Sequence, residues 1–159
     1  MKYIFSFIFL LVVNLLTGQD IFNSLKKGNH EELISLLKNG EQTDQYNENG
    51  LTPLWMAVFK NDSISVKVLI DNGANVNGLT KKGMPPIMVG AMVNAFESVR
   101  ILLENGADVN WKSSATSNQQ PIRFASNKGT IEFIQMLLAA GADLESTADD
   151  GGTPILAAV

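Results

Sequence analysis

The chain has 159 residues, of which 45% are hydrophobic and 18% charged, a composition that fits one compact soluble domain with a targeting segment. Its formal net charge is −4 and the two signs are interspersed, so we do not expect nucleic acid or an anionic membrane surface as a partner. It contains no cysteine, which excludes disulfides, thiolate metal sites and cysteine nucleophiles.

Residues 1–18 predict a secretory signal peptide. Lys2 precedes an apolar run over residues 4–13, and the small residue Gly18 lies where cleavage would follow. A membrane anchor is the alternative, but a spanning helix needs roughly 20 apolar residues. We therefore expect the mature chain to begin at Gln19. Small exported domains in oxidising compartments usually contain disulfides, so the lack of cysteine favours a bacterial envelope protein, periplasmic or secreted.

The chain then predicts a short helix from residue 21, a break at Gly28, and a second helix. Glu31 and Glu32 lie in the first turn of that second helix, where acidic side chains interact favourably with the helix dipole. Gly40 ends it, because glycine readily adopts the left-handed conformation that follows many helices.

The next unit shows the same pattern most clearly. After a turn at Gly50, Pro53 stands at the first position of a helix, where proline sacrifices no hydrogen bond. We expect this helix to run to about Lys60, and a longer one to run from Ile64 to Asn72.

This two-helix pattern recurs at a nearly constant period. The glycine that ends the second helix is found at positions 40, 73, 106 and 141, which predicts a stack of similar units. The predicted units are about 20–46, 47–79, 80–114 and 115–147, with a partial unit 148–159, all within a domain of residues 19–159. Apolar residues at helical spacing should face the core, namely Leu33, Leu36, Leu37, Val66, Leu69, Ile70, Val99, Leu102, Leu103, Ile134, Leu137 and Leu138.

Residues 50–57, 66–77, 83–90, 99–110 and 134–145 resemble the ankyrin repeat family, and 151–158 match the start of its pattern. That pattern is roughly Gly-x-Thr-Pro-Leu-His-x-Ala, a turn, then Val-x-x-Leu-Leu-x-x-Gly-Ala-Asp-x-Asn. The resemblance implies an all-α repeat fold, an ankyrin-repeat solenoid of stacked helix-turn-helix units with hairpin loops. The family's histidine and, in two units, its threonine are replaced, by Trp55, Met88, Arg123, Leu156, Pro85 and Gln120. Asn118 replaces a glycine, which is tolerable because asparagine can adopt a positive φ.

We find no candidate catalytic, cofactor-binding or metal-binding residues. His30 is the only histidine, and its register predicts an ordinary surface position at the start of a helix. Asp149 and Asp150 are interpreted as solubilising loop charges, with weak calcium binding as the alternative. Gly151-Gly152 lacks the lysine and spacing of a phosphate-binding loop.

By its register with the family, the chain presents candidate protein-binding residues at its hairpin tips and on the exposed edge of the first helix of each unit. They are Glu48, Asn49, Leu51, Lys81, Lys82, Met84 and Gln119 at the tips and Phe59, Lys60, Met92 and Asn127 on the helices. Leu51, Phe59, Met84 and Met92 are apolar where solvent is expected, which is typical of an interaction site. The alternative is that these side chains lean on neighbouring units and stay mostly buried.

The sequence thus predicts an exported, non-enzymatic scaffold that binds another protein through a concave face and needs no cofactor. One alternative is a substrate-docking array of a longer enzyme with its catalytic part beyond Val159. Another is a secreted effector or toxin-neutralising protein. Because the sequence stops inside a predicted first helix, we expect further repeats or another domain to follow; a frayed natural end is the alternative.

Overall fold

The computed structural model describes residues 21–112 and 116–154. The predicted signal peptide, its cleavage site and the chain after residue 154 lie outside these described residues. Within them the regular structure is helical and no strand is present. Residues 21–27 form a helical segment, followed by α2 (His30–Lys38), α3 (Pro53–Phe59), α4 (Ser63–Asp71), α5 (Pro86–Val93), α6 (Phe96–Glu104), α7 (Pro121–Lys128) and α8 (Ile131–Ala139).

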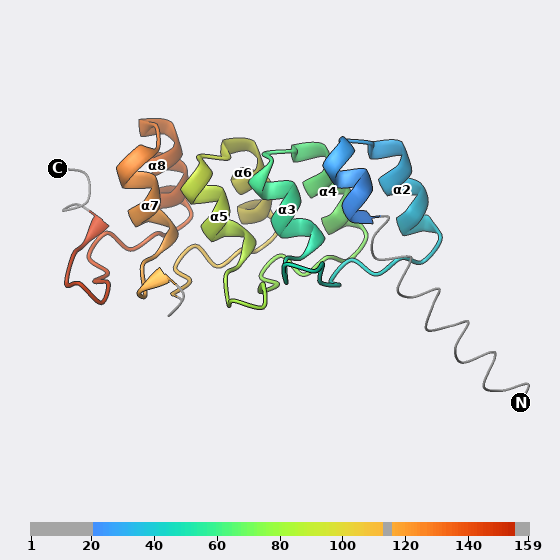
Figure 1. The fold of residues 1–159 in the computed structure, drawn as a ribbon. Coiled ribbons are helices and arrows are strands. Elements are labelled where there is room, and N and C mark those ends of the chain that lie inside the picture. The colour runs from blue at the N-terminus through green and yellow to red at the C-terminus, as the bar shows by residue number, and fades with distance from the viewer. Residues whose placement is uncertain (1–20, 113–115, 155–159) are drawn as a thin grey trace, which may run out of the picture.

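The helices stack in two layers, as Figure 1 shows. We call the segment 21–27, α3, α5 and α7 the inner helices, and α2, α4, α6 and α8 the outer helices. Helix α5 packs between α3 and α7 within the inner layer, and α4 packs against both α2 and α6 within the outer layer. Helices α3, α5 and α7 also pack on the outer helices of their own units, α4, α6 and α8. The predicted all-α repeat solenoid is therefore confirmed.

Local hydrogen bonds explain where the helices begin and end. The Thr52 hydroxyl oxygen accepts a hydrogen bond from the Trp55 amide at 3.2 Å, directly before Pro53 at the first helical position. At the end of α4, Gly73 has a φ of +90° and its amide donates to the Ile70 carbonyl. Backbone bonds of this kind satisfy the last carbonyls of a helix. The same positive φ is found at the other predicted helix-ending glycines, Gly40, Gly106 and Gly141.

The core runs continuously through the stack. Seven of the residues predicted to face the core are buried, namely Leu33, Leu37, Val66, Leu69, Val99, Leu102 and Leu137. Four more are partly buried and pack against the core, namely Leu36, Ile70, Leu103 and Ile134. The prediction was wrong for Leu138, which is 37% exposed. Phe133, fully buried four residues before Leu137, sets the buried stripe of α8, and Leu138 lies about 100° further around the helix.

An asparagine ladder joins successive units at the ends of the outer helices. The Asn110 side-chain amide donates to the Gly141 carbonyl at 2.8 Å, and its oxygen accepts from the Asp143 amide at 2.9 Å. Asn77 repeats both bonds one unit earlier, to Gly106 and Asp108. The Asn of the repeated Asp-x-Asn pattern therefore fixes the register between neighbouring units.

The fourth unit accommodates its missing glycine as predicted. Asn118 has a φ of +56°, whereas the corresponding Gly50 and Gly83 have φ values of +73° and +75°. The Asn118 side-chain amide also donates to the Asp149 carboxylate at 2.8 Å, which links this turn to the next hairpin.

Candidate functional site

The inner face, which consists of the exposed side of the inner helices and the hairpin tips, contains most of the predicted binding residues. Phe59 is 53% exposed at the end of α3, and Met92 and Val93 are 41% and 40% exposed at the end of α5. Helices α3 and α5 pack side by side (Figure 1), and these three exposed side chains lie at the ends of these neighbouring inner helices. Leu51 and Met84 are partly buried instead, and Met84 packs against the core.

Trp55 supports the exposed ring of Phe59 from one helical turn below. The two rings stack with centroids 5.4 Å apart and planes within 9° of parallel. Trp55 itself packs against the core, so the stack connects the exposed Phe59 to the interior of the unit. The arrangement limits the rotamers available to Phe59, which makes it a preorganised contact.

Lys60 differs from the other predicted binding residues because its ammonium group is already engaged within the chain. It donates to the carbonyls of Leu25 and Lys26 at 2.5 and 2.9 Å. These carbonyls end the first inner helical segment, where a cation stabilises the helix dipole. The stem of Lys60 stays exposed, but its charge serves the junction between the first two units.

The hairpin tips of the second and third units are tied together. The Lys81 amide donates to the Gly50 carbonyl at 2.9 Å, and the Lys81 ammonium lies 5.6 Å from the centre of the Tyr46 ring. The Tyr46 hydroxyl donates to the Leu79 carbonyl at 3.1 Å. The remaining predicted tip residues Glu48, Asn49 and Lys82 are exposed around this contact.

The fourth unit presents a polar version of the same face. Gln119 is partly buried and Asn127 is exposed. Arg123, at the position of the family's histidine, donates to both carboxylate oxygens of Asp150 at 2.8 and 2.6 Å. These hydrogen bonds hold the pKa of Asp150 below its ordinary value. The Asp150 carboxylate therefore secures the last hairpin, a role that the sequence interpretation missed.

His30 is not the ordinary surface histidine that the sequence predicted. It is the first residue of α2, and its Nε2 lies 3.0 Å from both carboxylate oxygens of Asp62, at the start of α4. The Ser65 hydroxyl donates to the same carboxylate at 2.7 Å. Partial burial raises the pKa of Asp62, but the hydrogen bonds from Ser65 and His30 outweigh this effect, and the pKa lies below its ordinary value.

This His30–Asp62–Ser65 cluster has the wrong arrangement for nucleophilic catalysis. In a catalytic triad the histidine lies between the nucleophile and the acid. Here the carboxylate lies in the middle, and the hydroxyl of the buried Ser65 donates its proton to that carboxylate. The cluster therefore connects the first two units rather than forming an active site.

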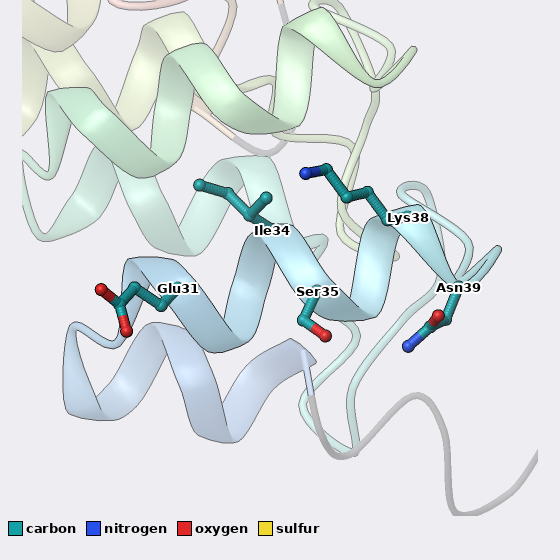
Figure 2. A pocket seen from close by; sticks show the side chains of 5 residues that line it. All are labelled: Glu31, Ile34, Ser35, Lys38 and Asn39. Carbon is teal, nitrogen blue, oxygen red and sulfur yellow. The ribbon is translucent and has the colours of Figure 1, made fainter.

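Two open hollows lie on the outer helices, away from the inner face. One, of about 380 Å³, lies on α2; Figure 2 shows Ile34 and Lys38 there pointing away from Ser35 and Asn39. The other, of about 320 Å³, lies between α4 and α6 beside Ile64 and Ile101. In neither hollow do polar groups converge as in a ligand site. The described residues also contain no group of three or more His, Asp or Glu side chains placed to bind a metal ion.

Comparison with protein families matches this geometry. A family model described as ankyrin repeats (3 copies) covers residues 21–113, more than half of the chain. The chain belongs to the ankyrin repeat family. A comparison with curated proteins found no match. Ankyrin repeats generally mediate protein–protein interactions and are typically non-catalytic. Helices α7 and α8 continue the repeat beyond the matched region, and within the described part of this ankyrin-repeat chain no helix is long and apolar enough to cross a membrane.

Proposed function

We propose that this ankyrin-repeat chain is a non-enzymatic scaffold that binds another protein through its inner face. The observation that carries the proposal is the group of exposed large apolar side chains on neighbouring units, Phe59, Met92 and Val93. Apolar side chains gathered on one exposed face, with polar groups around them, are typical of protein-binding sites.

The second and third units supply the main contacts. Equivalent positions at the ends of the inner helices are occupied by Phe59, Met92 and Asn127, so the face changes from aromatic to aliphatic to polar along the stack. Aromatic residues in preorganised positions contribute strongly to binding energy, and methionine adapts to the shape of a partner. We therefore assign the anchoring role to Phe59 and Met92 and a peripheral role to Asn127.

The test is a double substitution on the inner face, Phe59→Glu with Met92→Glu. Both side chains are exposed, so the substitutions leave the core and the helical content intact, whereas partner binding is lost because two carboxylates replace the apolar anchors. Affinity capture from an envelope extract measures binding, and far-UV circular dichroism measures helix content.

The matched control is Ile64→Glu with Ile131→Glu on the outer helices, where the two side chains are 55% and 72% exposed. This control adds the same charge to the opposite layer and should retain the partner. If the inner-face variant captures the partner as well as the wild type does, the inner face is not the binding site.

The proposed location is outside the cytoplasm, in the periplasm or the surrounding medium of a bacterial cell. This proposal rests on the charged start, apolar run and small residue of positions 1–18. Cell fractionation followed by N-terminal sequencing should find a mature chain that begins at Gln19. Recovery of the full-length chain from the cytosol would contradict export.

A further inference from the structure

We infer that the partner presents an acidic segment with apolar anchors, which lies across the inner face from the first unit to the third. This inference rests on the proposed function, because it specifies the chemistry of the partner at the same face. Two observations support it: the inner and outer helices differ in charge, and several of the inner-face lysines form no ion pair within the described residues.

The two layers differ in charge. The described inner helices contain no acidic residue, and their charged residues with described side chains are Lys26, Lys27 and Arg123. The outer helices combine three basic residues with a larger set of acidic ones, Glu31, Glu32, Asp71, Glu97, Glu104 and Glu132. The inner layer is therefore positive and the outer layer negative, although the whole chain has a net charge of −4.

Ion pairs occupy most of the basic side chains of the outer helices but few of those on the inner face. On the outer helices, Lys67 pairs with Asp71, and Arg100 pairs with Glu97 and Glu104. Among the inner-face side chains that the structure describes, Arg123 alone has a carboxylate partner. Within the described residues, four exposed lysines of the inner face form no ion pair, namely Lys26, Lys27, Lys81 and Lys82.

The unpaired lysines lie near both ends of the inner helices, two of them at the end that carries the apolar anchors and two at a hairpin tip before α5. Lys60 follows Phe59 directly, and its ammonium group binds the Lys26 carbonyl, which places the first-unit lysines beside the Phe59 end of α3. Lys81 and Lys82 occupy the third-unit hairpin tip, which the Lys81 amide joins to the second-unit turn. Glu48 is the one exposed acidic residue at the second-unit tip.

The helix spacing sets the expected pattern of the partner segment. Packed helices lie about 8–10 Å apart, and an extended peptide rises about 3.3 Å per residue. One unit of the stack therefore corresponds to about three residues of partner. In whichever direction the segment runs, an acidic pair opposite Lys26 and Lys27 should lie about three positions from the residue that contacts Phe59, and an apolar residue opposite Met92 should lie about three positions to its other side.

A peptide segment fits this face better than a nucleic acid or a membrane does. Those polyanions present extended charge, and binding to them draws on a broad basic surface. Here the basic residues are few, they share the inner face with apolar side chains, and the outer helices behind them are acidic. An acidic segment with apolar anchors fits both features, because complementary charges speed association and buried apolar side chains supply most of the binding energy.

The test selects peptides from a random twelve-residue display library on the full immobilised chain. We expect enrichment of peptides with an acidic pair about three positions from an aromatic or aliphatic residue. Lys26→Glu with Lys27→Glu should weaken binding of the selected peptides about tenfold, because each attraction becomes a repulsion. Lys67→Glu on the outer helix α4 is the control and should leave the affinity unchanged, and binding should weaken as salt rises.

Each other outcome overturns the inference. Selected peptides without acidic enrichment, an affinity unaffected by charge reversal, or the absence of any enriched peptide would show that the face does not recognise such a segment. Binding to phosphatidylserine vesicles or to DNA that depends on Lys26 and Lys27 would assign these lysines to a membrane or nucleic acid. If Phe59→Glu with Met92→Glu still abolishes capture of the natural partner in these cases, the proposed function stands and only the partner chemistry is refuted.

Discussion

Asn110→Ala should weaken the junction between the third and fourth units. The Asn110 side chain donates to the Gly141 carbonyl at 2.8 Å and accepts from the Asp143 amide at 2.9 Å. Alanine removes both bonds and leaves the backbone unchanged. A hydrogen bond contributes about 0.5–1.5 kcal/mol net, and these groups are solvent-exposed, so the junction should lose about 1–2 kcal/mol.

The effect should be local, because each unit of a solenoid contacts only its neighbours. Amide hydrogen exchange by mass spectrometry can resolve it. A loss of about 1–2 kcal/mol corresponds to exchange that is roughly 5–30-fold faster in α7 and α8, whereas α3 and α4 should exchange as in the wild type. Urea unfolding should lose cooperativity, since the fourth unit separates from the stack before the others unfold.

Asn105→Ala is the matched control for this experiment. Its side-chain amide donates to the Ile101 carbonyl at 2.8 Å, so this hydrogen bond stays within the third unit. This variant should leave exchange in α8 unchanged. If Asn110→Ala alters exchange in α8 no more than Asn105→Ala does, the ladder contributes nothing to the stacking of units and the reasoning is refuted.

Two further predictions concern packing and pH. Gly90→Ala should lower the free energy of unfolding by about 1 kcal/mol, because the added methyl group would lie 2.3 Å from Val99 Cγ2. Overpacking of this kind costs about 1–3 kcal/mol, which outweighs the better helix propensity of alanine. Denaturant midpoints measure this, and the loss should largely vanish in a Val99→Ala background; a stabilised single variant would contradict it. Because the folded pKa of Asp62 is depressed, its contribution is present above the unfolded pKa of about 4 and is lost as pH falls through the folded value. Asp62→Asn, which keeps a capping side chain, should therefore flatten the acid side of the stability profile, and an unchanged acid limb in urea unfolding at several pH values would refute this role.

The helices and their boundaries could be predicted from the sequence because the signals that set them are local. Pro53 at a helix start and Gly73 after a helix end act through their own backbone geometry, which needs no knowledge of the neighbouring unit. The exposed anchors Phe59 and Met92 could also be predicted, since the repeat register places their positions on the inner edge. Whether they contact a partner stays a prediction.

The contacts between units could not be predicted in the same way. In the junction of the second and third units, the Asn61 side-chain oxygen accepts a hydrogen bond from the Ser98 hydroxyl at 3.0 Å. Ser98 lies in the first turn of α6, and the N-cap residue of that helix, Ala95, has no side chain that could form a capping hydrogen bond. The bond pairs residues from adjacent copies, and only the stacked arrangement reveals it. The engagement of Lys60 by the first unit and of His30 by Asp62 depends on the same packing.

The next junction shows what happens when one copy of such a pair changes. Phe133 takes the position that Ser98 occupies one unit earlier, and Asn94 takes that of Asn61. Phenylalanine cannot donate, so within the described residues the buried Asn94 Oδ1 has no hydrogen-bond partner, while the Phe133 ring fills the core beside Phe96 at 6.1 Å between centroids. Apolar burial thus replaces a polar contact between units.

The fourth unit consequently depends on contacts that lie away from the recognition residues. The Asn110 ladder holds it at the outer side of the stack, and Arg123 uses its charge to fix the following hairpin through Asp150. The Arg123 guanidinium already has a carboxylate partner, whereas Lys26, Lys27, Lys81 and Lys82 have none among the described residues. The proposed recognition residues of the first three units and the Arg123–Asp150 pair that fixes the last hairpin therefore lie in different parts of the stack. This separation is why charge reversal at Lys26 and Lys27 should change binding with little effect on stability, whereas loss of Asn110 should change the stacking of the fourth unit and leave the apolar anchors in place.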